Sequence, residues 1–230
     1  WRPNMPGSFV WKSALPQIGM FVLVFAGVML FGTLRFSALV KALQRSEARN
    51  AFLARHDSLT GLRNRSGFDE KAAEIAGRDG GTPFAIIALD LDRFKAVNDR
   101  HGHAAGDAVL QAVARRFAER IGAHGCAARF GGDEFCMLLA GEYSREILVG
   151  LAEGLVRDAQ LPIAHDGQLL LIGGSAGIAQ FPDHGRSLHD VMVMADAALY
   201  AAKNAGRNRA THACDLCMEE IIEARASRAA

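Results

Sequence analysis

A pair of glycines followed by two carboxylates is the stretch of this sequence best suited to chemistry. Gly131 and Gly132 stand between apolar segments, and Asp133 and Glu134 follow them directly. Apolar segments around Gly-Gly predict a β-hairpin, because the tight turn needs positive φ, which glycine reaches without a steric penalty. Bare backbone beside two carboxylates suits a phosphate-bearing ligand held through a divalent cation. An acidic surface turn is the alternative for residues 129–135.

A second pair of carboxylates follows a continuous apolar run. Residues 84–89 are all apolar and Asp90 ends the run, which predicts a central strand covered on both faces. Ligands of such sheets gather at strand ends, where Asp90 and Asp92 lie. A strand-ending surface carboxylate is the alternative for Asp90. A helix ending near Ile121 follows, with Asp107 in its first turn, where a carboxylate can also simply favour the helix dipole.

The remaining periodic segments predict helices that pack around this strand. They are expected at about 66–76, 143–159 and 187–205, with β segments at 169–179 that Gly173 and Gly174 interrupt. Gly206 is placed as the residue that ends the last helix. Lys203 and Arg207 lie at that end, where solvated charges also favour a helix C-terminus.

The N-terminal part of the chain is strongly apolar. No charged side chain stands between Lys12 and Arg35, and residues 18–34 are almost all apolar. About 20 such residues cross the hydrocarbon core of a bilayer, so we expect a transmembrane helix at 13–35; a buried core helix or a signal peptide are the alternatives. Basic residues are more frequent after this span than before it, which predicts that the C-terminal side is cytoplasmic and that residues 1–12 form an extracytoplasmic stub.

Residues 36–55 contain no Pro or Gly and predict a juxtamembrane helix. This helix would act either as a dimerising stalk or as an amphipathic helix lying on the following domain. The 230 residues suffice for one ordinary domain and more, and half of them are hydrophobic. A net charge of +1 argues against a nucleic-acid partner. The chain does not begin with Met, which suggests a fragment of a longer protein.

The cysteines give only a weak signal. Cys214 and Cys217 form a CxxC pair near His212, but a zinc site needs four ligands and no second pair stands out. Two reduced thiols before a short helix at 218–225 are the expectation for the tail, residues 213–230.

Four segments in order resemble the motifs of the GGDEF family, the diguanylate cyclases. They are HDSLTGLRNR at 56–65, LDLDRFKAVNDRHGHAAGD at 89–107, GGDEF at 131–135 and ADAALYAAKNAGRNR at 195–209. The resemblance covers about residues 52–212 and implies a catalytic domain at 56–212. Its implied fold is a palm-like α/β (α+β) nucleotide-cyclase fold, with a mainly antiparallel central sheet and surrounding helices.

The resemblance implies an enzyme anchored in the inner (cytoplasmic) membrane, with its catalytic domain in the cytoplasm. A homodimer would condense two GTP into cyclic di-GMP and release two pyrophosphates. Mg²⁺, with Mn²⁺ as another option, would be held by Asp90 and Asp133 with the Leu91 carbonyl. Glu134 would either help to bind metal or take the 3′-OH proton. A catalytically silent module that binds GTP or cyclic di-GMP is the alternative.

The resemblance also implies how the substrate is bound. Guanine would be read by Asn98 and Asp107, and the hairpin would lie against the nucleotide at Gly131 and Gly132. The triphosphate would be held by the backbone near Arg93 and Phe94 and by the cations Lys95, Lys203 and Arg207.

One departure from the family concerns regulation. Many members carry an RxxD site before the signature, where the product binds and arrests the enzyme. Gly122 and Gly125 occupy these two positions here, so we expect little product inhibition through such a site.

Overall fold

The computed structural model describes residues 7–76 and 81–216, and the chain divides into two units, Trp1–Phe52 and Leu53–Ala230. Helix α1 (Gly7–Arg55) provides the described residues of the first unit and extends past the boundary at Phe52. It runs without a break from the apolar segment into the predicted juxtamembrane segment. Its large apolar side chains from Ile18 to Phe36 are exposed. By length and composition, α1 is the single helix among the described residues that could cross a membrane.

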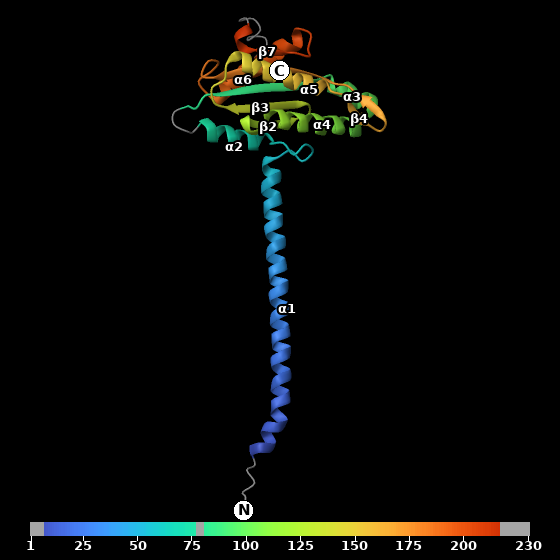
Figure 1. Ribbon diagram of the computed structural model, residues 1–230, viewed down its shortest axis with the longest axis vertical. Helices are drawn as coiled ribbons and strands as arrows, with labels where there is room; N and C mark the ends of the chain where they lie inside the picture. The colour runs from blue at the N-terminus through green and yellow to red at the C-terminus, as the bar shows by residue number, and fades with distance from the viewer. Residues whose placement is uncertain (1–6, 77–80, 217–230) are drawn as a thin grey trace, which may run out of the picture. The chain divides into compact units, whose positions relative to one another are not determined.

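The second unit is built on a five-stranded sheet (Figure 1). Strand order is β2-β3-β1-β6-β7, and every neighbouring pair is antiparallel except β6–β7. The strands are β1 (Phe84–Asp92), β2 (Gly125–Gly131), β3 (Glu134–Ala140), β6 (Gly173–Phe181) and β7 (Ala210–His212), and β4 (Ile163–His165) and β5 (Gln168–Leu170) form a separate hairpin. The position of β1 at the centre of the sheet agrees with the prediction from its apolar run, and the mainly antiparallel pairing agrees with the fold that the motif resemblance implied.

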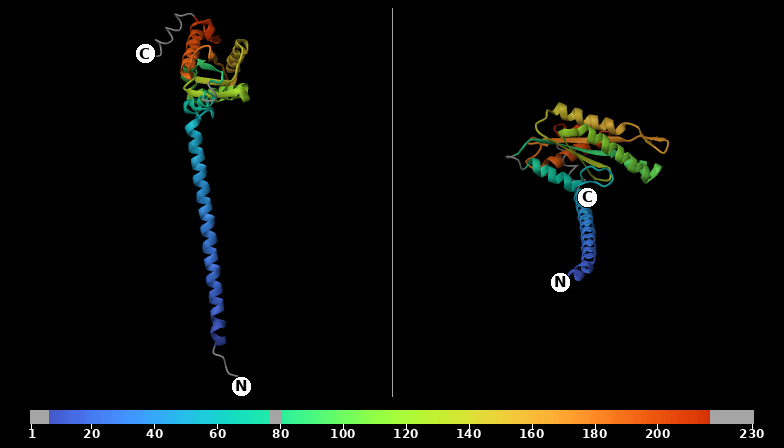
Figure 2. Two further views of the ribbon diagram at one scale, coloured as in Figure 1. Left: turned by 90° about the vertical axis from the view of Figure 1, so that its left-hand side faces the viewer. Right: turned by 60° about the horizontal axis from the view of Figure 1, so that its bottom comes forward.

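Helices cover both faces of this sheet, and the layers can be followed in Figure 2. They are α2 (Arg65–Ala76), α3 (Phe94–His101), α4 (His103–Ile121), α5 (Arg145–Gln160) and α6 (Leu188–Asn204), with short 3₁₀ turns η1 (Gly122–His124) and η2 (Ala213–Asp215). One buried cluster joins the sheet to α4 and α5, and a second joins it to α2 and α6.

The apolar run of β1 is continuous because both faces of the strand are buried. Ile87 and Leu89 belong to the cluster under α4 and α5, whereas Ile86 belongs to the cluster under α2 and α6. This follows from the two-residue period of a strand. Helix α6 lies very close to β6, because a Cβ at Gly177 would come within 2.1 Å of the Ala195 carbonyl oxygen.

Two sequence predictions in the sheet were wrong in detail. Strand β1 does not end at Asp90 but continues to Asp92, since Asp90 and the two following residues stay paired with β6. Gly173 and Gly174 do not interrupt a strand; they begin β6, where small residues face the end of β1. The short helix predicted at 218–225 lies outside the described residues.

Candidate active site

The end of β1 and the β2–β3 turn bring three carboxylates together. Asp90 lies directly opposite Glu134 in the pairing of β1 with β3. The backbone N–H of Leu91 donates to the Asp133 carbonyl at 3.2 Å, which fixes the turn against the strand. In a strand the N–H and C=O of one residue leave on the same side, so the Leu91 carbonyl also faces the turn. Like charges directly opposite each other destabilise a sheet, which indicates a site for a cation.

Lys203 is the cation that the structure places inside this cluster. Its Nζ lies 2.9 Å from Oδ1 of Asp90, whose side chain is 14% exposed. Burial raises the pKa of Asp90 above its usual value, Lys203 opposes that shift, and the charges of Asp133 and Glu134 add to it. Lys203 thus pairs with a carboxylate whose charge two neighbouring carboxylates disfavour. The donors are all oxygens, which are the ligands that Mg²⁺ and Mn²⁺ prefer, so the residues present fit such an ion.

The turn itself offers bare backbone, as the sequence predicted. Gly131 has φ 142° and Gly132 has φ 52°, and both are exposed. A Cβ at either position would meet no atom within 4 Å, so the space beside the turn is open. A ligand can therefore approach the main chain of the turn closely.

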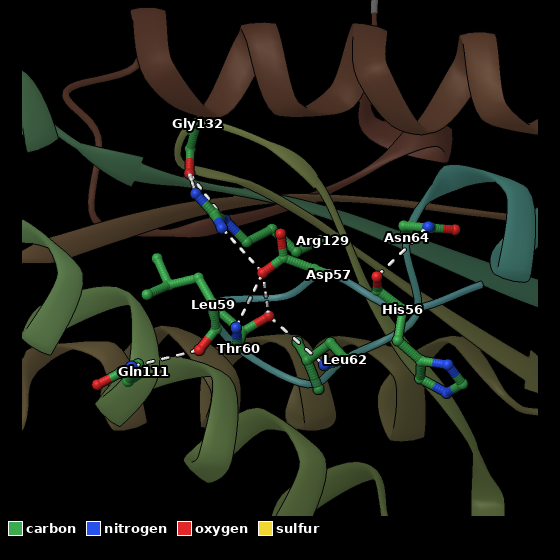
Figure 3. A network of polar contacts seen from close by, with 9 residues as sticks. All are labelled: His56, Asp57, Leu59, Thr60, Leu62, Asn64, Gln111, Arg129 and Gly132. Atoms are coloured by element: carbon green, nitrogen blue, oxygen red, sulfur yellow. Dashed lines mark hydrogen bonds and ion pairs between the residues drawn. The ribbon is translucent and has the colours of Figure 1, made fainter. Parts of the chain in front are cut away.

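Arg129 anchors the Gly-Gly turn by hydrogen bonds, a role that the sequence alone did not indicate. Its Nε and Nη2 donate to the Gly132 carbonyl at 3.0 and 2.8 Å, and its Nη1 donates to Asp57 Oδ1 at 2.9 Å (Figure 3). The Arg129 side chain is 11% exposed. Charge-assisted bonds of this kind fix geometry more firmly than neutral ones. The Gly-Gly turn is thereby tied to a residue 72 positions earlier in the chain.

Asp57 is itself held by the turn that follows it. It accepts from the backbone N–H of Thr60 at 2.9 Å and from the Thr60 hydroxyl at 2.6 Å. Burial alone would raise the pKa of Asp57, but the hydrogen bonds from Thr60 and Arg129 together outweigh it, and the pKa lies below its usual value. The Arg63 carbonyl also accepts from the backbone N–H of Arg129 at 2.8 Å, so the 56–65 segment is docked along β2.

Helices α3 and α4 place Asn98 close to Asp107. A Cβ at Gly106 would come within 1.9 Å of Asn98 Oδ1, so the Asn98 amide lies against the residue just before Asp107. Asp107 is exposed. It was predicted in the first turn of its helix, which is wrong, because α4 begins at His103 after the non-helical Gly102. A carboxylate one turn further along gains little from the helix dipole, which weakens that alternative.

The other residues expected to bind phosphate are Arg93, Phe94, Lys95 and Arg207. Arg93, with φ 60°, precedes α3, whose first residue Phe94 is buried, whereas Lys95 on the same helix is exposed. Arg207 does not join Lys203 at Asp90, because its Nε lies 3.9 Å from Asp92 Oδ1. An open cavity of about 600 Å³ is lined by residues that include Asp92, Arg93 and Arg207.

Asp92 serves the structure of this region, because its oxygens already have donors. It accepts from the Ser175 hydroxyl at 2.8 and 3.1 Å and from the backbone N–H of Asn208 at 3.0 Å. These bonds fix the chain that follows α6, where Arg207 and Asn208 both have positive φ. Asp92 therefore positions Arg207. Sequence reasoning missed Ser175, because nothing in its own neighbourhood marks a partner on the next strand.

Comparison with known proteins shows the family and the fold. Residues 54–209 match the family model described as diguanylate cyclase, GGDEF domain. The chain therefore belongs to the GGDEF family, and the palm-like α/β fold expected from its motifs is confirmed by solved relatives. Homologues named as diguanylate cyclases associate this domain with the synthesis of cyclic di-GMP.

Two relatives from Pseudomonas aeruginosa show how much of each protein is shared. The bifunctional diguanylate cyclase/cyclic di-GMP phosphodiesterase MucR is 41% identical over 177 residues, covering 76% of this chain and 26% of MucR. The diguanylate cyclase TpbB is 38% identical over 183 residues, covering 75% of this chain and 42% of TpbB. The chain thus spans less than half the length of these two relatives.

A solved structure of the coiled coil and GGDEF domain of DgcB from Caulobacter crescentus, in complex with cyclic di-GMP, is also similar. It has a TM-score of 0.69 and 33% sequence identity, and the match covers 76% of this chain and 94% of that one.

Proposed function

We propose that this protein is an active diguanylate cyclase that condenses two GTP into cyclic di-GMP and releases two pyrophosphates. The observation that carries the proposal is the juxtaposition of Asp90 and Glu134 on paired strands, with Asp133 beside them and Lys203 as the nearby cation. Neighbouring carboxylates repel one another and destabilise the fold when no cation is bound. Their presence therefore supports a site for a divalent cation and not a role in the hydrophobic core. A silent module would not need to keep all three carboxylates.

The carboxylates and Lys203 would share the work at the reacting phosphate. Asp90, Asp133 and the Leu91 carbonyl would hold Mg²⁺, or Mn²⁺, which supplies Lewis acidity when bound. Glu134, which is exposed, would add a ligand or accept the proton of the attacking 3′-OH. Lys203 lies within 2.9 Å of Asp90 and can turn its charge toward the triphosphate.

Base recognition is assigned to Asn98 and Asp107. An amide can donate to guanine O6, and a carboxylate can accept from N1 and N2. The contact of Asn98 Oδ1 with Gly106 keeps the amide beside Asp107, which supports this pairing. Gly131 and Gly132 would lie against the nucleotide. Lys95, Arg207 and the backbone at Arg93 and Phe94 would bind phosphate oxygens near the cavity beside Asp92.

The reaction joins two GTP molecules, so two domains must face each other, and α1 is proposed to bring them together. Its residues 36, 39, 43, 46, 50 and 53 follow an a/d heptad pattern. Four of these are apolar, namely Phe36, Leu39, Leu43 and Leu53, and their side chains are exposed. Asn50 stands at an a position, where a polar residue can fix register. The coiled coil of the DgcB structure supports this assignment.

The membrane anchor is proposed from the first part of α1. Apolar side chains from Ile18 to Leu34 are exposed all around the helix, as expected for a lipid-facing span and not for a core helix. We assign residues 1–12 to an extracytoplasmic stub, 13–35 to the span, 36–55 to the juxtamembrane helix, 56–212 to the catalytic domain and 213–230 to a tail. The Arg and Lys residues after the span favour a catalytic domain on the cytoplasmic side.

The test is conversion of GTP by the purified chain in detergent with Mg²⁺, with product separated by liquid chromatography and molecular mass measured by light scattering. Cyclic di-GMP is expected from the dimer. Replacing Leu39 and Leu43 by Asp should lower both the dimer fraction and the rate. A dimer that binds GTP but forms no cyclic di-GMP would show a silent module instead.

A further inference from the structure

A cluster of nitrogen and sulfur donors lies at the other end of the sheet from the carboxylates. His184 follows β6, His212 is the last residue of β7, and Cys214 lies in η2. One donor atom from each lies within 4.8 Å of the other two, and His184 Nε2 is 3.2 Å from Cys214 Sγ. The active-site chemistry above uses none of these residues.

The state of His212 indicates that the cluster is incomplete without a ligand. The residue is 2% exposed, and its Nε2 is buried with no hydrogen-bond partner in the described part of the chain. An unsatisfied buried polar group costs about 1–3 kcal/mol, so such a group in a native fold calls for a partner. Burial lowers the pKa of His212, which favours the neutral ring. Without metal, Nδ1 of His212 accepts from the backbone N–H of Cys214 at 3.2 Å, so the ring proton lies on the unpartnered Nε2. Binding a metal through Nε2 therefore moves this proton to Nδ1 and releases the Cys214 N–H.

The imidazole of His184 has a hydrogen-bond partner on the ring nitrogen that faces away from Cys214. Nδ1 of His184 lies 3.2 Å from the Gln180 carbonyl oxygen. The backbone N–H of Gln180 lies 3.1 Å from the same Nδ1, so the tautomer decides whether Nδ1 accepts from that N–H or donates to the carbonyl. In the tautomer that donates to the carbonyl, Nε2 presents its lone pair toward Cys214. A backbone carbonyl that orients the ring in this manner is the common arrangement around ligating histidines.

The donor set selects a different ion from the one expected at Asp90. Two imidazoles and a thiolate suit Zn²⁺, whereas Mg²⁺ requires oxygen ligands. In a tetrahedral zinc site the nitrogen and sulfur donors lie about 3.3–3.6 Å apart. The donors here are within 4.8 Å of one another, so small side-chain rotations bring them to that spacing. Cys214 is exposed, which gives the ion a path of access.

We propose that His184, His212 and Cys214 form a structural Zn²⁺ site, which fastens the turn after β6 to the segment after β7. Each histidine binds through one ring nitrogen and keeps its proton on the other. The Cys214 thiol loses its proton to solvent when the metal binds, so affinity falls as pH falls. Three protein ligands leave a fourth position for water or for a further donor.

The test uses the purified chain in detergent, stripped with a chelator, re-equilibrated with Zn²⁺ and freed of excess metal. Atomic emission spectrometry should then count about one Zn²⁺ per chain. Co²⁺ in its place should give the visible absorption of a tetrahedral site with a thiolate charge-transfer band. Added Zn²⁺ should raise the melting temperature, since it binds the native state. None of these readouts needs GTP, so they stand or fall separately from the cyclase proposal.

Variants identify the ligands. Cys214→Ser and His184→Gln should each weaken Zn²⁺ binding at least about tenfold and remove the melting shift, since even outer partners of a metal site are worth that much. The matched controls Cys126→Ser and His165→Gln should bind like the parent. Zinc content unchanged in Cys214→Ser, or lost equally in the controls, would overturn the proposal. So would loss of metal in Cys217→Ser with retention in Cys214→Ser, because the ligand set would then be another.

Discussion

At one end of the central sheet, β1 and the β2–β3 turn gather only oxygen donors, whereas the segments after β6 and β7 gather two imidazoles and a thiol at the other end. The two sets differ in burial as well as in chemistry. Glu134 and the Gly-Gly turn are exposed, whereas His212 is almost fully buried. The oxygen donors suit a divalent cation that also binds substrate phosphates, while the imidazoles and the thiol suit Zn²⁺.

The comparison also shows what each end costs the protein without its ligand. The pKa of Asp90 is raised because burial and the neighbouring carboxylates disfavour its charged form. The ion pair with Lys203 offsets only part of this pKa shift. At the other end, the destabilising feature is Nε2 of His212, which is buried without a hydrogen-bond partner among the described residues. Removing a donor should therefore affect chemistry at the first end and stability at the second.

The largest effect is expected for Asp90→Asn. Loss of this carboxylate should lower the rate of cyclic di-GMP formation at least about 10²-fold, the scale of losing one transition-state charge stabiliser. The melting temperature without metal should not fall, because the change removes a charge that burial disfavours. Rates and thermal unfolding curves, compared with those of Asp99→Asn at an exposed position of α3, check both parts. A rate within a few-fold of the parent would rule out Asp90 as a metal ligand.

The next effect concerns base choice. The double variant Asn98→Ala with Asp107→Ala should reduce the preference for GTP over ATP by at least about tenfold, because a site built to hydrogen-bond a base edge rejects bases that leave it unpaired. Asp99→Ala, next to Asn98 and exposed, is the control. Competition between the two nucleotides gives the ratio of kcat/KM. An unchanged ratio would mean that guanine is read elsewhere.

Arg129→Lys should lower kcat about tenfold with little change in KM. Lysine cannot hold the Gly132 carbonyl and Asp57 at the same time, so the turn that carries Asp133 becomes less well positioned. Steady-state kinetics measure the change, and Arg157→Lys, at an exposed position of α5, serves as the control. Full activity in Arg129→Lys would show that the anchor of the turn is dispensable.

Asp57 should make stability depend on pH. Its pKa is lowered in the folded protein, so its contribution is fully present above the unfolded value near 3.8 and is lost as pH falls through the folded value. Asp57→Asn should therefore cost on the order of 1–2 kcal/mol at pH 7 and progressively less below about pH 4. Denaturant unfolding of parent and variant at several pH values measures this difference. A difference that does not change with pH would contradict the ion pair.

The smallest effect is expected for product inhibition. Gly122 and Gly125 offer no side chain to bind product, and nearby Arg120 is already paired with Asp158 on α5. Cyclic di-GMP added at saturating GTP should lower the initial rate by less than about twofold. Strong inhibition at low micromolar product would reveal a second product site on the described domain or outside it.

Much of the oxygen-donor end could be predicted because its residues lie within short motifs. The Gly-Gly turn, the central strand and the helix ending near Ile121 follow from local periodicity. Register could not be predicted, since the pairing of Asp90 with Glu134 depends on how strands far apart in sequence align. For the same reason nothing in the sequence connected Asp57 with Arg129.

The nitrogen-sulfur end was missed for a related reason. Cys214 and His212 are close in sequence and gave a weak signal, but His184 is 30 residues from Cys214 and reaches it only because β7 pairs parallel to β6. Without that pairing no spacing rule collects the three donors. Strand order is set by tertiary packing, which a single sequence does not display.

The most direct measurement is a side-by-side time course of cyclic di-GMP and pyrophosphate for the parent, Asp133→Asn and Cys214→Ser, all as dimers with GTP and Mg²⁺. The parent and Cys214→Ser are predicted to release two pyrophosphates for each cyclic di-GMP, while Asp133→Asn forms neither product at more than about 1% of the parent rate. Turnover by Asp133→Asn within a few-fold of the parent, or no cyclic di-GMP from a parent dimer that binds GTP, would contradict the assignment of this chain as an active cyclase.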